Sequence, residues 1–151
     1  MTEPIRVLFL CTHNSARSQI AEALLRHMGE TDFAVFSAGT EVTRVHPLAI
    51  RVLEEEGIST DELYSKSLTT FLGQRFDVVI TVCDQANERC PIFPGDPERI
   101  HWSIPDPSAV TGTDEERIAA FRTVYQDLTQ RLPRVIETQR HKRDVAAHTA
   151  T

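Results

Sequence analysis

The sequence predicts an α/β protein built as three layers, α/β/α, around a parallel sheet of four strands. Short apolar runs alternate with amphipathic segments along the 151 residues, and connections of crossover length join parallel strands. The first run, Ile5–Leu10, is apolar at four successive positions from Val7, which is typical of a strand buried on both faces. A chain of this size forms a single domain with a substantial core.

The other elements follow from hydrophobic period and from the residues that punctuate it. Between Ala16 and Met28 the apolar residues recur at helical spacing, and Gly29 is typical of a helix end. The run Phe-Asp-Val-Val-Ile-Thr-Val at 76–82 is the strongest strand signal in the chain. Two more strands are predicted at Phe33–Ser37 and Arg99–Ile104, and a second helix begins at Pro47 and ends at Gly57.

A capping-box pattern begins the last helix. Thr113 and Glu116 precede apolar positions 118, 121, 125, 128 and 132, which step by three and four residues. Pro133 is expected to end or kink this helix. We assign one domain to residues 1–138 and expect the polar tail 139–151, which has no clear apolar period, to fray or to be disordered.

Composition and charge narrow the classes of function. The formal net charge of −6 gives no support for nucleic-acid binding, so an anion site would be a local positive pocket. No apolar run has the length of a membrane span, and the first residues do not form a secretory signal. We expect a cytoplasmic protein, in which the three cysteines rest as thiols and any disulfide is transient and catalytic.

The string Cys-Thr-His-Asn-Ser-Ala-Arg-Ser, from Cys11 to Ser18, directly follows the first strand. A short link from a strand into a helix points successive backbone N–H groups at one place, where they bind an anion. Arg17 adds a planar, permanently charged fork for two oxygens of that anion. We call residues 12–18 the anion loop, and its predicted ligand is a tetrahedral oxyanion held by Thr12, His13, Asn14, Ser15, Ala16, Arg17 and Ser18.

Cys11 is the predicted nucleophile of this loop. The helix dipole, the inward N–H groups and Arg17 all favour the thiolate, which is the reactive form. Ser18 is placed to hydrogen-bond the sulfur, and Asn14 tolerates the left-handed backbone that such a loop requires. A cysteine that closes a buried strand is often only a small hydrophobic residue, and its spacing from Arg17 is by itself a weak signal. The position between strand and helix favours the catalytic interpretation.

A second pair of cysteines, Cys83 and Cys90, follows the strongest strand. The six residues between them are polar, and a polar segment with few core anchors opens at low cost. Two alternatives compete with a redox role: Cys83 packs under the sheet, or Cys83, Cys90 and His101 bind zinc. The spacing exceeds the roughly two to four residues of ordinary zinc sites, which argues against the metal. Because Cys11 and Cys83 both end strands, disulfide exchange between thiols is the favoured interpretation.

Asp106 is a candidate general acid. Pro105 and Pro107 bracket it and fix its backbone, so its carboxyl group is suited to protonate an oxygen that leaves a nearby anion site. An Asp-Pro pair is also an ordinary turn signal, and its spacing alone favours that alternative.

Taken together, these motifs resemble those of the thioredoxin-coupled arsenate reductases, which share the fold of the low-molecular-weight protein tyrosine phosphatases. The resemblance spans about residues 5–132 and includes Gln19-Ile20-Ala21-Glu22, Ser37-Ala38-Gly39, His101-Trp102 and Asp106-Pro107. The loop alone identifies the superfamily, whereas the Cys83/Cys90 pair makes the resemblance specific to the reductases. It also favours a catalytic role for Asp106 over a simple turn.

The resemblance implies a reaction cycle without a tightly bound cofactor. Cys11 attacks the arsenic of arsenate, and a hydroxyl leaves as water with help from Asp106. Cys83 then attacks Cys11, arsenite departs, and Cys90 passes the oxidation to a Cys83–Cys90 disulfide, which thioredoxin reduces. Phosphate and sulfate are expected to compete with arsenate. We expect a monomer that binds neither nucleic acid nor membrane.

The loop departs from the common family pattern at two positions. His13 stands where glycine is frequent, which changes the backbone freedom there and brings a ring near the anion. Ala16 replaces the second loop cysteine that many relatives carry. Its absence removes one unproductive disulfide partner for Cys11.

A third departure concerns a monovalent cation. Asn14, Glu22 and Ser37 match a potassium site of some reductases in the family. The region of the remaining ligand is Ser65-Lys66-Ser67, which offers no carboxylate. Lys66 is the candidate to supply the positive charge itself, so a dependence on potassium is not expected.

Two other functions fit part of the pattern. A protein tyrosine or aryl phosphatase would use the same Cys11, Arg17 and Asp106, although Ser108 replaces the aromatic residue typical of that family, and a phosphatase has no need of the second cysteine pair. A non-enzymatic oxyanion or arsenite binder is a third alternative, since three thiols can hold arsenite. The second pair favours thioredoxin as reductant, with glutathione and glutaredoxin as the alternative.

Overall fold

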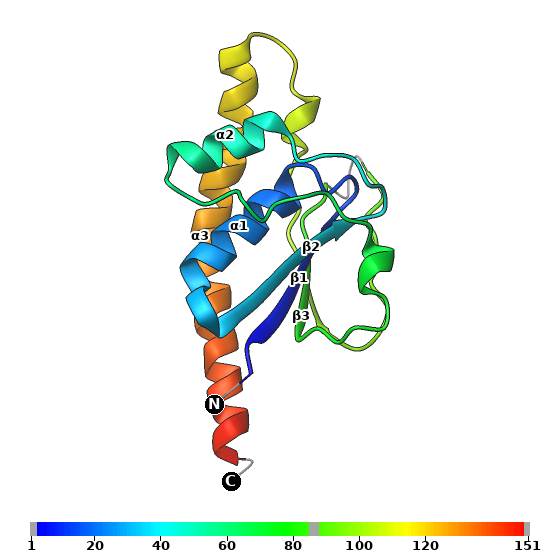
Figure 1. Ribbon diagram of the computed structural model, residues 1–151, viewed down its shortest axis with the longest axis vertical. Helices are drawn as coiled ribbons and strands as arrows, with labels where there is room; N and C mark the ends of the chain where they lie inside the picture. Colours follow the sequence, from blue (N-terminus) through cyan, green and yellow to red (C-terminus); the bar gives the residue numbers. More distant parts are fainter. Residues whose placement is uncertain (1–2, 85–87, 150–151) are drawn as a thin grey trace.

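The computed structural model describes residues 3–84 and 88–149. Strands and helices alternate along the chain as far as β3, which β4 follows with no helix among the described residues between them (Figure 1). The strands are β1 (Ile5–Cys11), β2 (Phe33–Gly39), β3 (Val78–Thr81) and β4 (Glu98–His101). The helices are α1 (Arg17–Gly29), α2 (Pro47–Glu55) and α3 (Asp114–Thr149), with short 3₁₀ turns η1 (Glu30–Asp32), η2 (Leu68–Phe71) and η3 (Pro107–Ala109).

The four strands are parallel and lie in the order β2-β1-β3-β4. β1 is therefore central, and its Leu10 lies beside Ala38 of β2 and Thr81 of β3. The predicted four-stranded parallel sheet is confirmed. The predicted bounds differ at the strand ends, most of all in β4, which ends at His101 rather than at Ile104.

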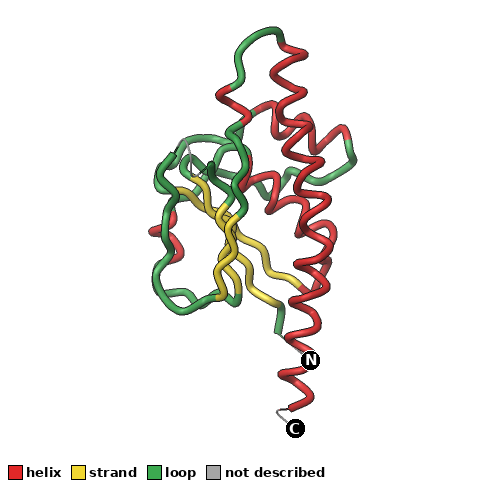
Figure 2. Tube along the Cα trace, turned by 180° about the vertical axis from the view of Figure 1, so that it is seen from behind, coloured by secondary structure: helices red, strands yellow, loops and turns green. Residues whose placement is uncertain are grey.

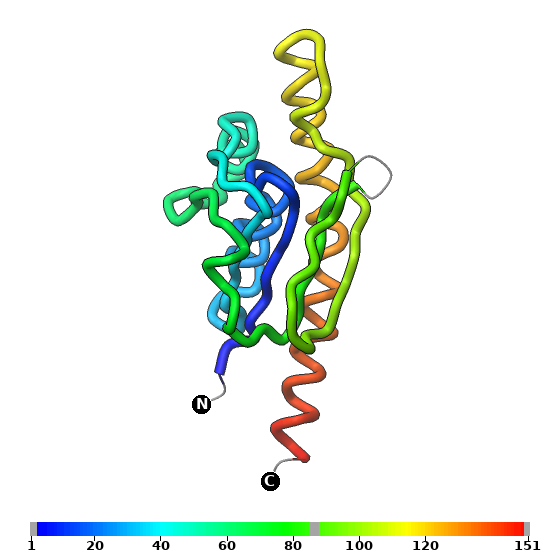
Figure 3. Tube along the Cα trace, turned by 90° about the vertical axis from the view of Figure 1, so that its right-hand side faces the viewer, coloured from blue at the N-terminus to red at the C-terminus, as the bar shows by residue number. Residues whose placement is uncertain are grey.

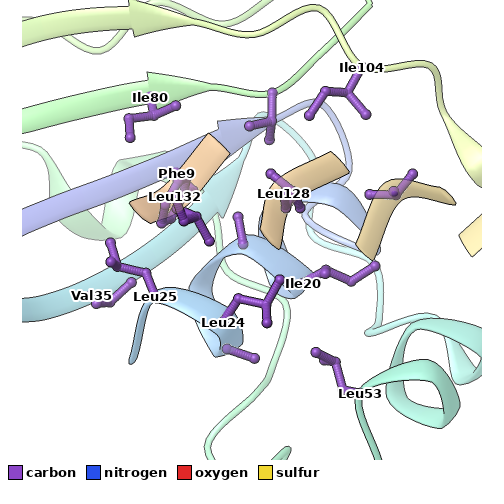
Figure 4. Packing of buried hydrophobic residues seen from close by; sticks show 14 of the residues in the cluster. Phe9, Ile20, Leu24, Leu25, Val35, Leu53, Ile80, Ile104, Leu128 and Leu132 are labelled. Carbon is purple, nitrogen blue, oxygen red and sulfur yellow. The ribbon is translucent and has the colours of Figure 1, made fainter. Parts of the chain in front are cut away.

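The α-helices pack on one face of the sheet. Helix α3 contacts α1, α2 and β1, and α1 also contacts β1 and β2. Figure 4 shows apolar side chains from these elements meeting in one core, among them Phe9, Ile20, Leu24, Leu128 and Leu132. Their burial stabilises the fold and fixes α1 behind the loop that precedes it.

The opposite face of the sheet is covered by η2 and by loops rather than by a long helix, as Figure 2 shows. Four aromatic rings pack there edge to face, with centroids 5.5–5.9 Å apart: Phe36, Phe71, Phe76 and Phe93. The third layer of the α/β/α arrangement is thus formed by the 3₁₀ turn η2 and by loops whose aromatic side chains pack on the sheet.

The capping box predicted for the last helix is present at the start of α3. Glu116 donates its backbone N–H to Thr113 Oγ1 at 3.1 Å, and its carboxylate accepts the Thr113 N–H at 3.2 Å. Of the two effects expected of Pro133, the helix end is wrong, because α3 continues through this residue. Leu132, Val135 and Ile136 around it are buried, and their packing offsets the roughly 3 kcal/mol that an internal proline costs.

Residues 139–149, which we expected to fray, continue α3 past the end of the sheet (Figure 3). Gln139 is buried, and Arg140 and Arg143 pair with Asp32 at 2.8 and 2.9 Å. These contacts join distant parts of the chain, so a search for apolar period within the tail could not reveal them. Among the described helices none combines the length and the apolar character that crossing a membrane requires.

Candidate active site

The carboxyl ends of β1 and β3 bring two cysteines to the same edge of the sheet. Leu10 pairs with Thr81, and Val82 donates its N–H to Leu10 O at 2.8 Å. Cys11 follows at the end of β1, and Cys83 follows Val82. Both cysteines are buried. This is the edge where ligands bind in open parallel sheets.

Asn14 holds the anion loop in shape. It has a φ of 49°, the left-handed backbone expected for it. Its Nδ2 donates to Ser18 Oγ at 2.8 Å and to Ser37 Oγ at 2.9 Å, while Oδ1 accepts from the Lys66 N–H at 2.7 Å and from Gln19 Nε2 at 2.9 Å. Since the amide of this fully buried side chain uses its full hydrogen-bonding capacity, the loop is rigidly specified.

Gly39, at the end of β2, permits the close approach of the loop. A Cβ at this position would lie 2.6 Å from Thr12 O and 2.8 Å from Asn14 N. Thr43 reinforces the contact by donating its hydroxyl to His13 O at 2.9 Å. From the sequence Gly39 is recognised only as part of a turn. Its contact with the anion loop forms when the chain folds and could not be predicted.

The outer side of the loop is fixed by contacts with exposed and half-buried groups. His13 Nδ1 lies 2.9 Å from Glu41 Oε2, and both side chains are largely exposed. Ser15 O accepts the backbone N–H of His46 at 2.9 Å. Burial and the nearby Arg117 lower the pKa of His46, so its ring is neutral near pH 7.

Cys11 is a free, buried thiol whose sulfur lies 2.9 Å from Ser18 Oγ. The contact predicted between these two residues is therefore present. Ala16 is the N-cap of α1, and no described side chain caps that helix. The N–H groups of its first turn therefore have no side-chain cap and are available to bind an oxyanion.

Arg17 is buried and connects three parts of the site. Its guanidinium faces the Glu88 carboxylate with both terminal nitrogens, of which Nη2 lies 3.1 Å from Oε2. Nη1 donates to Ile104 O at 3.0 Å, and Nη2 lies 3.9 Å from Asp106 Oδ2. Burial alone would lower the pKa of Arg17, but Glu88 and Cys11 raise it overall, so the group is always charged.

Glu88 is a site residue that the sequence did not reveal. Besides Arg17 it contacts the Asp84 N–H, at 2.7 Å, and Thr12 Oγ1, at 3.4 Å. Burial would raise its pKa, but the hydrogen bonds from Arg17 and the Asp84 backbone lower it overall, so the carboxylate is charged at neutral pH. It occupies the arginine fork predicted to hold two oxygens of the anion.

Cys83 and Cys90 are joined by a disulfide with their Cα atoms 5.9 Å apart. This is the pairing that the family resemblance implied for the end of the relay. Cys83 is buried, whereas Cys90 is partly exposed and lines a surface cavity of about 560 Å³. Residues 85–87 between them lie outside the described part of the chain.

The end of β4 adds His101 to this pair. The ligand atoms of Cys83, Cys90 and His101 all lie within 4.8 Å of one another. The sequence offered these same three residues as a zinc alternative, which the spacing of the two cysteines argued against; the fold nevertheless brings all three together. The three side chains are of the types that Zn²⁺ prefers.

Asp106 forms a local turn and also lies beside Arg17, while its role as general acid stays a prediction. It is the N-cap of η3, where Oδ1 accepts from Ser108 N at 2.9 Å and from Ser108 Oγ at 2.7 Å. Its other oxygen faces Arg17. The carboxyl group is therefore held rigidly at the margin of the anion loop.

Lys66 lies in the cluster predicted to bind a monovalent cation. Its buried ammonium is 3.3 Å from Glu22 Oε1 and donates to Tyr64 O at 2.6 Å. Ser37 Oγ donates to the same Glu22 oxygen at 2.6 Å, and Asn14 binds the Lys66 backbone. Burial lowers the pKa of Lys66, and the Glu22 charge opposes that effect.

A buried cysteine and arginine on a rigid strand–loop–helix cradle define the class: a cysteine-dependent oxyanion enzyme on a parallel α/β sheet. The sequence matches the low molecular weight phosphotyrosine protein phosphatase family over residues 6–146. The chain belongs to that family, as its motifs had indicated.

The similar proteins include several reductases. The arsenate reductase of Halalkalibacterium halodurans is 39% identical over 132 residues, which is 87% of this chain and 95% of that protein. The Bacillus subtilis arsenate reductase is 35% identical with the same coverage. An arsenate reductase solved in its phosphate-binding state superposes with a TM-score of 0.75 at 33% identity, covering 89% of this chain and 98% of that one.

A thioredoxin-dependent arsenate reductase of Corynebacterium glutamicum gives a TM-score of 0.65 at 30% identity, over 92% of this chain and 65% of that one. The tyrosine phosphatase Wzb of Escherichia coli K30, 22% identical over 92% of this chain and 99% of that one, shares the fold with a TM-score of 0.64. The resemblance to reductases built on a phosphatase fold is thus confirmed.

Proposed function

We propose that this protein is an arsenate reductase that works through three thiols and is re-reduced by thioredoxin. One observation carries the proposal: a Cys83–Cys90 disulfide stands beside an anion loop whose Cys11 is a free thiol. A phosphatase needs the loop but has no use for the pair. The arsenate reductases among the similar proteins support the same reaction.

In the first step arsenate binds the anion loop through backbone N–H groups and Arg17, after Glu88 has left the guanidinium. The Cys11 thiolate attacks arsenic and forms a sulfur–arsenic bond, while one arsenic–oxygen bond breaks. The leaving oxygen departs as water, with a proton from Asp106 at the margin of the loop. Ser18 steadies the sulfur before the attack.

In the second step Cys83 attacks the Cys11 sulfur. The sulfur–arsenic bond breaks, its electron pair stays on arsenic, and As(V) leaves as arsenite, As(III). Cys90 then attacks Cys83 and releases the Cys11 thiolate, so that the Cys83–Cys90 disulfide forms. A thioredoxin dithiol supplies the two electrons that reopen it. Cys90 lines a surface cavity, which gives such a reductant access.

The site requires no tightly bound cofactor for this cycle, and Lys66 supplies the charge that potassium would bring. Its ammonium already pairs with Glu22, which a cation at this position would need as ligand. Potassium chloride and sodium chloride should therefore affect the rate equally. A rate raised well beyond the sodium value by potassium would contradict this role of Lys66.

The decisive experiment measures NADPH consumption with thioredoxin, thioredoxin reductase and arsenate. We expect arsenate-dependent turnover in the wild type and none with Cys90→Ser. The variant should still release one equivalent of arsenite, because Cys11 and Cys83 suffice for a single turnover. If the wild type turns over only with glutathione and glutaredoxin, thioredoxin is the wrong reductant.

A weaker phosphatase activity is the second candidate, supported by Asp106 beside Arg17 in the loop that both reactions share. With an aryl phosphate as substrate, Cys83→Ser should keep phosphatase activity and lose arsenate turnover. Loss of both activities would assign Cys83 a structural role. Phosphate and sulfate should inhibit both reactions, since they compete for the same loop. We place the reaction in the cytoplasm, where thioredoxin keeps thiols reduced, and in a monomer.

A further inference from the structure

We propose that the reduced Cys83 and Cys90, together with His101, form a binding site for Zn²⁺ or a similarly thiophilic divalent cation. When the metal is bound, both thiolates are engaged and the relay cannot close its disulfide. The cation therefore acts as a redox-dependent inhibitor of the proposed reductase. This inference rests on the proposed function only for its effect on turnover, because binding itself depends on the three side chains.

The fold gathers the three ligand atoms in one place, although the two sulfurs are bonded to each other while the disulfide is closed. They are within 4.8 Å of one another. Zinc binds sulfur at about 2.3 Å and imidazole nitrogen at about 2.0–2.1 Å, so the ligands of a tetrahedral site lie roughly 3.5–4 Å apart. Reduction of the disulfide adds two protons and two electrons and lets the sulfurs separate. Binding of Zn²⁺ then displaces the thiol protons to solvent.

The position of each ligand favours an accessible site with an open coordination position. Cys83 is buried just after the end of β3, whereas Cys90 and His101 line the surface cavity of about 560 Å³. Thr81 Oγ1 lies 2.6 Å from His101 Nδ1 and holds the ring in place. Such a contact orients a ligating imidazole. The cavity would leave a fourth coordination position open to water.

His101 has no part in the proposed thiol relay, and that makes it the diagnostic residue. A general tendency of dithiols to bind zinc would require only Cys83 and Cys90. A built site requires the imidazole as well, from a strand that the cysteines do not belong to. The effect of His101 on the affinity for Zn²⁺ therefore distinguishes a specific three-ligand site from nonspecific binding by the Cys83/Cys90 dithiol.

The test titrates Zn²⁺ into protein reduced by a phosphine, using a chromophoric chelator as competitor and no arsenate. We expect one equivalent to bind to the wild type. His101→Ala and Cys90→Ser should weaken binding by about tenfold or more. Cys11→Ser and His27→Ala, a histidine exposed on α1, should bind like the wild type. The oxidised protein should not bind at this site.

Unchanged affinity in His101→Ala, or equal binding by the oxidised protein, would overturn the proposal. Substitution with Co²⁺ adds a second readout, because thiolate-to-cobalt absorption should appear in the wild type and weaken in Cys90→Ser. Circular dichroism of each variant shows whether it has kept its fold.

The effect on the reaction is measured without thioredoxin. One addition of arsenate to reduced protein should consume two thiols, and one equivalent of Zn²⁺ should prevent that loss. If metal-free protein fails to reduce arsenate, the proposed function fails while the binding result stands. If arsenate is reduced equally with and without bound metal, the inhibitory role is wrong.

Discussion

The anion loop and the segment from Cys83 to Cys90 meet at Arg17, but they are held in different ways. The loop is fixed by buried polar contacts centred on Asn14 and by the close approach of Gly39. The cysteine segment is tied at its ends by one disulfide and, from Glu88, by contacts with Arg17, Thr12 and a backbone N–H. The first set of contacts involves no cysteine thiol, whereas the disulfide is the product of the proposed relay.

This difference separates two tasks of one site. A cradle for a tetrahedral anion must keep its geometry through the cycle, because small displacements of oxyanion donors cost much of their effect. A relay must change partners at each step, so its contacts have to be replaceable. Glu88 joins the two regions, since it places a carboxylate on the arginine while the disulfide is closed.

The largest effect is expected from Arg17→Lys. The change keeps the charge but removes the fork that faces two oxygens. We expect kcat/KM for arsenate to fall by about 10²–10³-fold, as for loss of an oxyanion donor. Steady-state kinetics give the value, and Arg143→Lys on α3 is the matched control. An effect below tenfold would show that the backbone N–H groups alone carry the anion.

Gly39→Ala tests the rigidity of the loop. A methyl group 2.6 Å from Thr12 O forces the backbone apart. We expect a loss of about 1–3 kcal/mol in the free energy of unfolding and a matching fall in activity. Gly57→Ala is the control, because its site is open but its φ of 72° is strained. It should lose stability without losing activity; equal activity in both variants would mean that the loop tolerates displacement.

Glu88→Gln should raise the affinity of the oxidised protein for phosphate severalfold, because it frees Arg17 from a competing carboxylate. Calorimetric titration measures it, with Glu41→Gln as the control for a lost charge near the loop. Since the folded state lowers the pKa of Glu88, the pair persists at neutral pH and opens only as pH falls through that lowered value. The difference between variant and wild type should shrink in acid. Equal phosphate affinity at neutral pH would show that Glu88 does not compete.

The smallest change concerns Lys66→Gln. Removing the ammonium leaves Arg26, which lies 2.8 Å from the other Glu22 oxygen, as the cationic partner of that carboxylate. We expect a modest loss of activity that potassium chloride restores and sodium chloride restores less well. Lys142→Gln, at the surface of α3, should respond to neither salt. A potassium-insensitive Lys66→Gln would show that Arg26 alone is enough to balance the charge of Glu22.

Much of the site could be predicted because its chemistry is local. The anion loop is a continuous string in which each residue type has a physical role, from the left-handed Asn14 to the hydroxyl of Ser18 beside the sulfur. The parallel sheet could be predicted as well, since apolar runs and connections of crossover length are typical of parallel strands. Failures occurred where distant contacts decide: α3 continues through Pro133 because its flanking residues are buried, and the polar tail is helical because Arg140 and Arg143 reach Asp32.

Hydrophobic period and local backbone demands are encoded over a few neighbouring residues, so they were enough to predict the strand–loop–helix cradle, its candidate nucleophile and arginine, and the second cysteine pair. Which groups meet around these residues depends on how distant segments pack. Glu88 on Arg17, Gly39 under the loop, Lys66 beside Glu22 and His101 beside the disulfide all come from other segments. Their positions follow from strand order and packing, which no local spacing expresses.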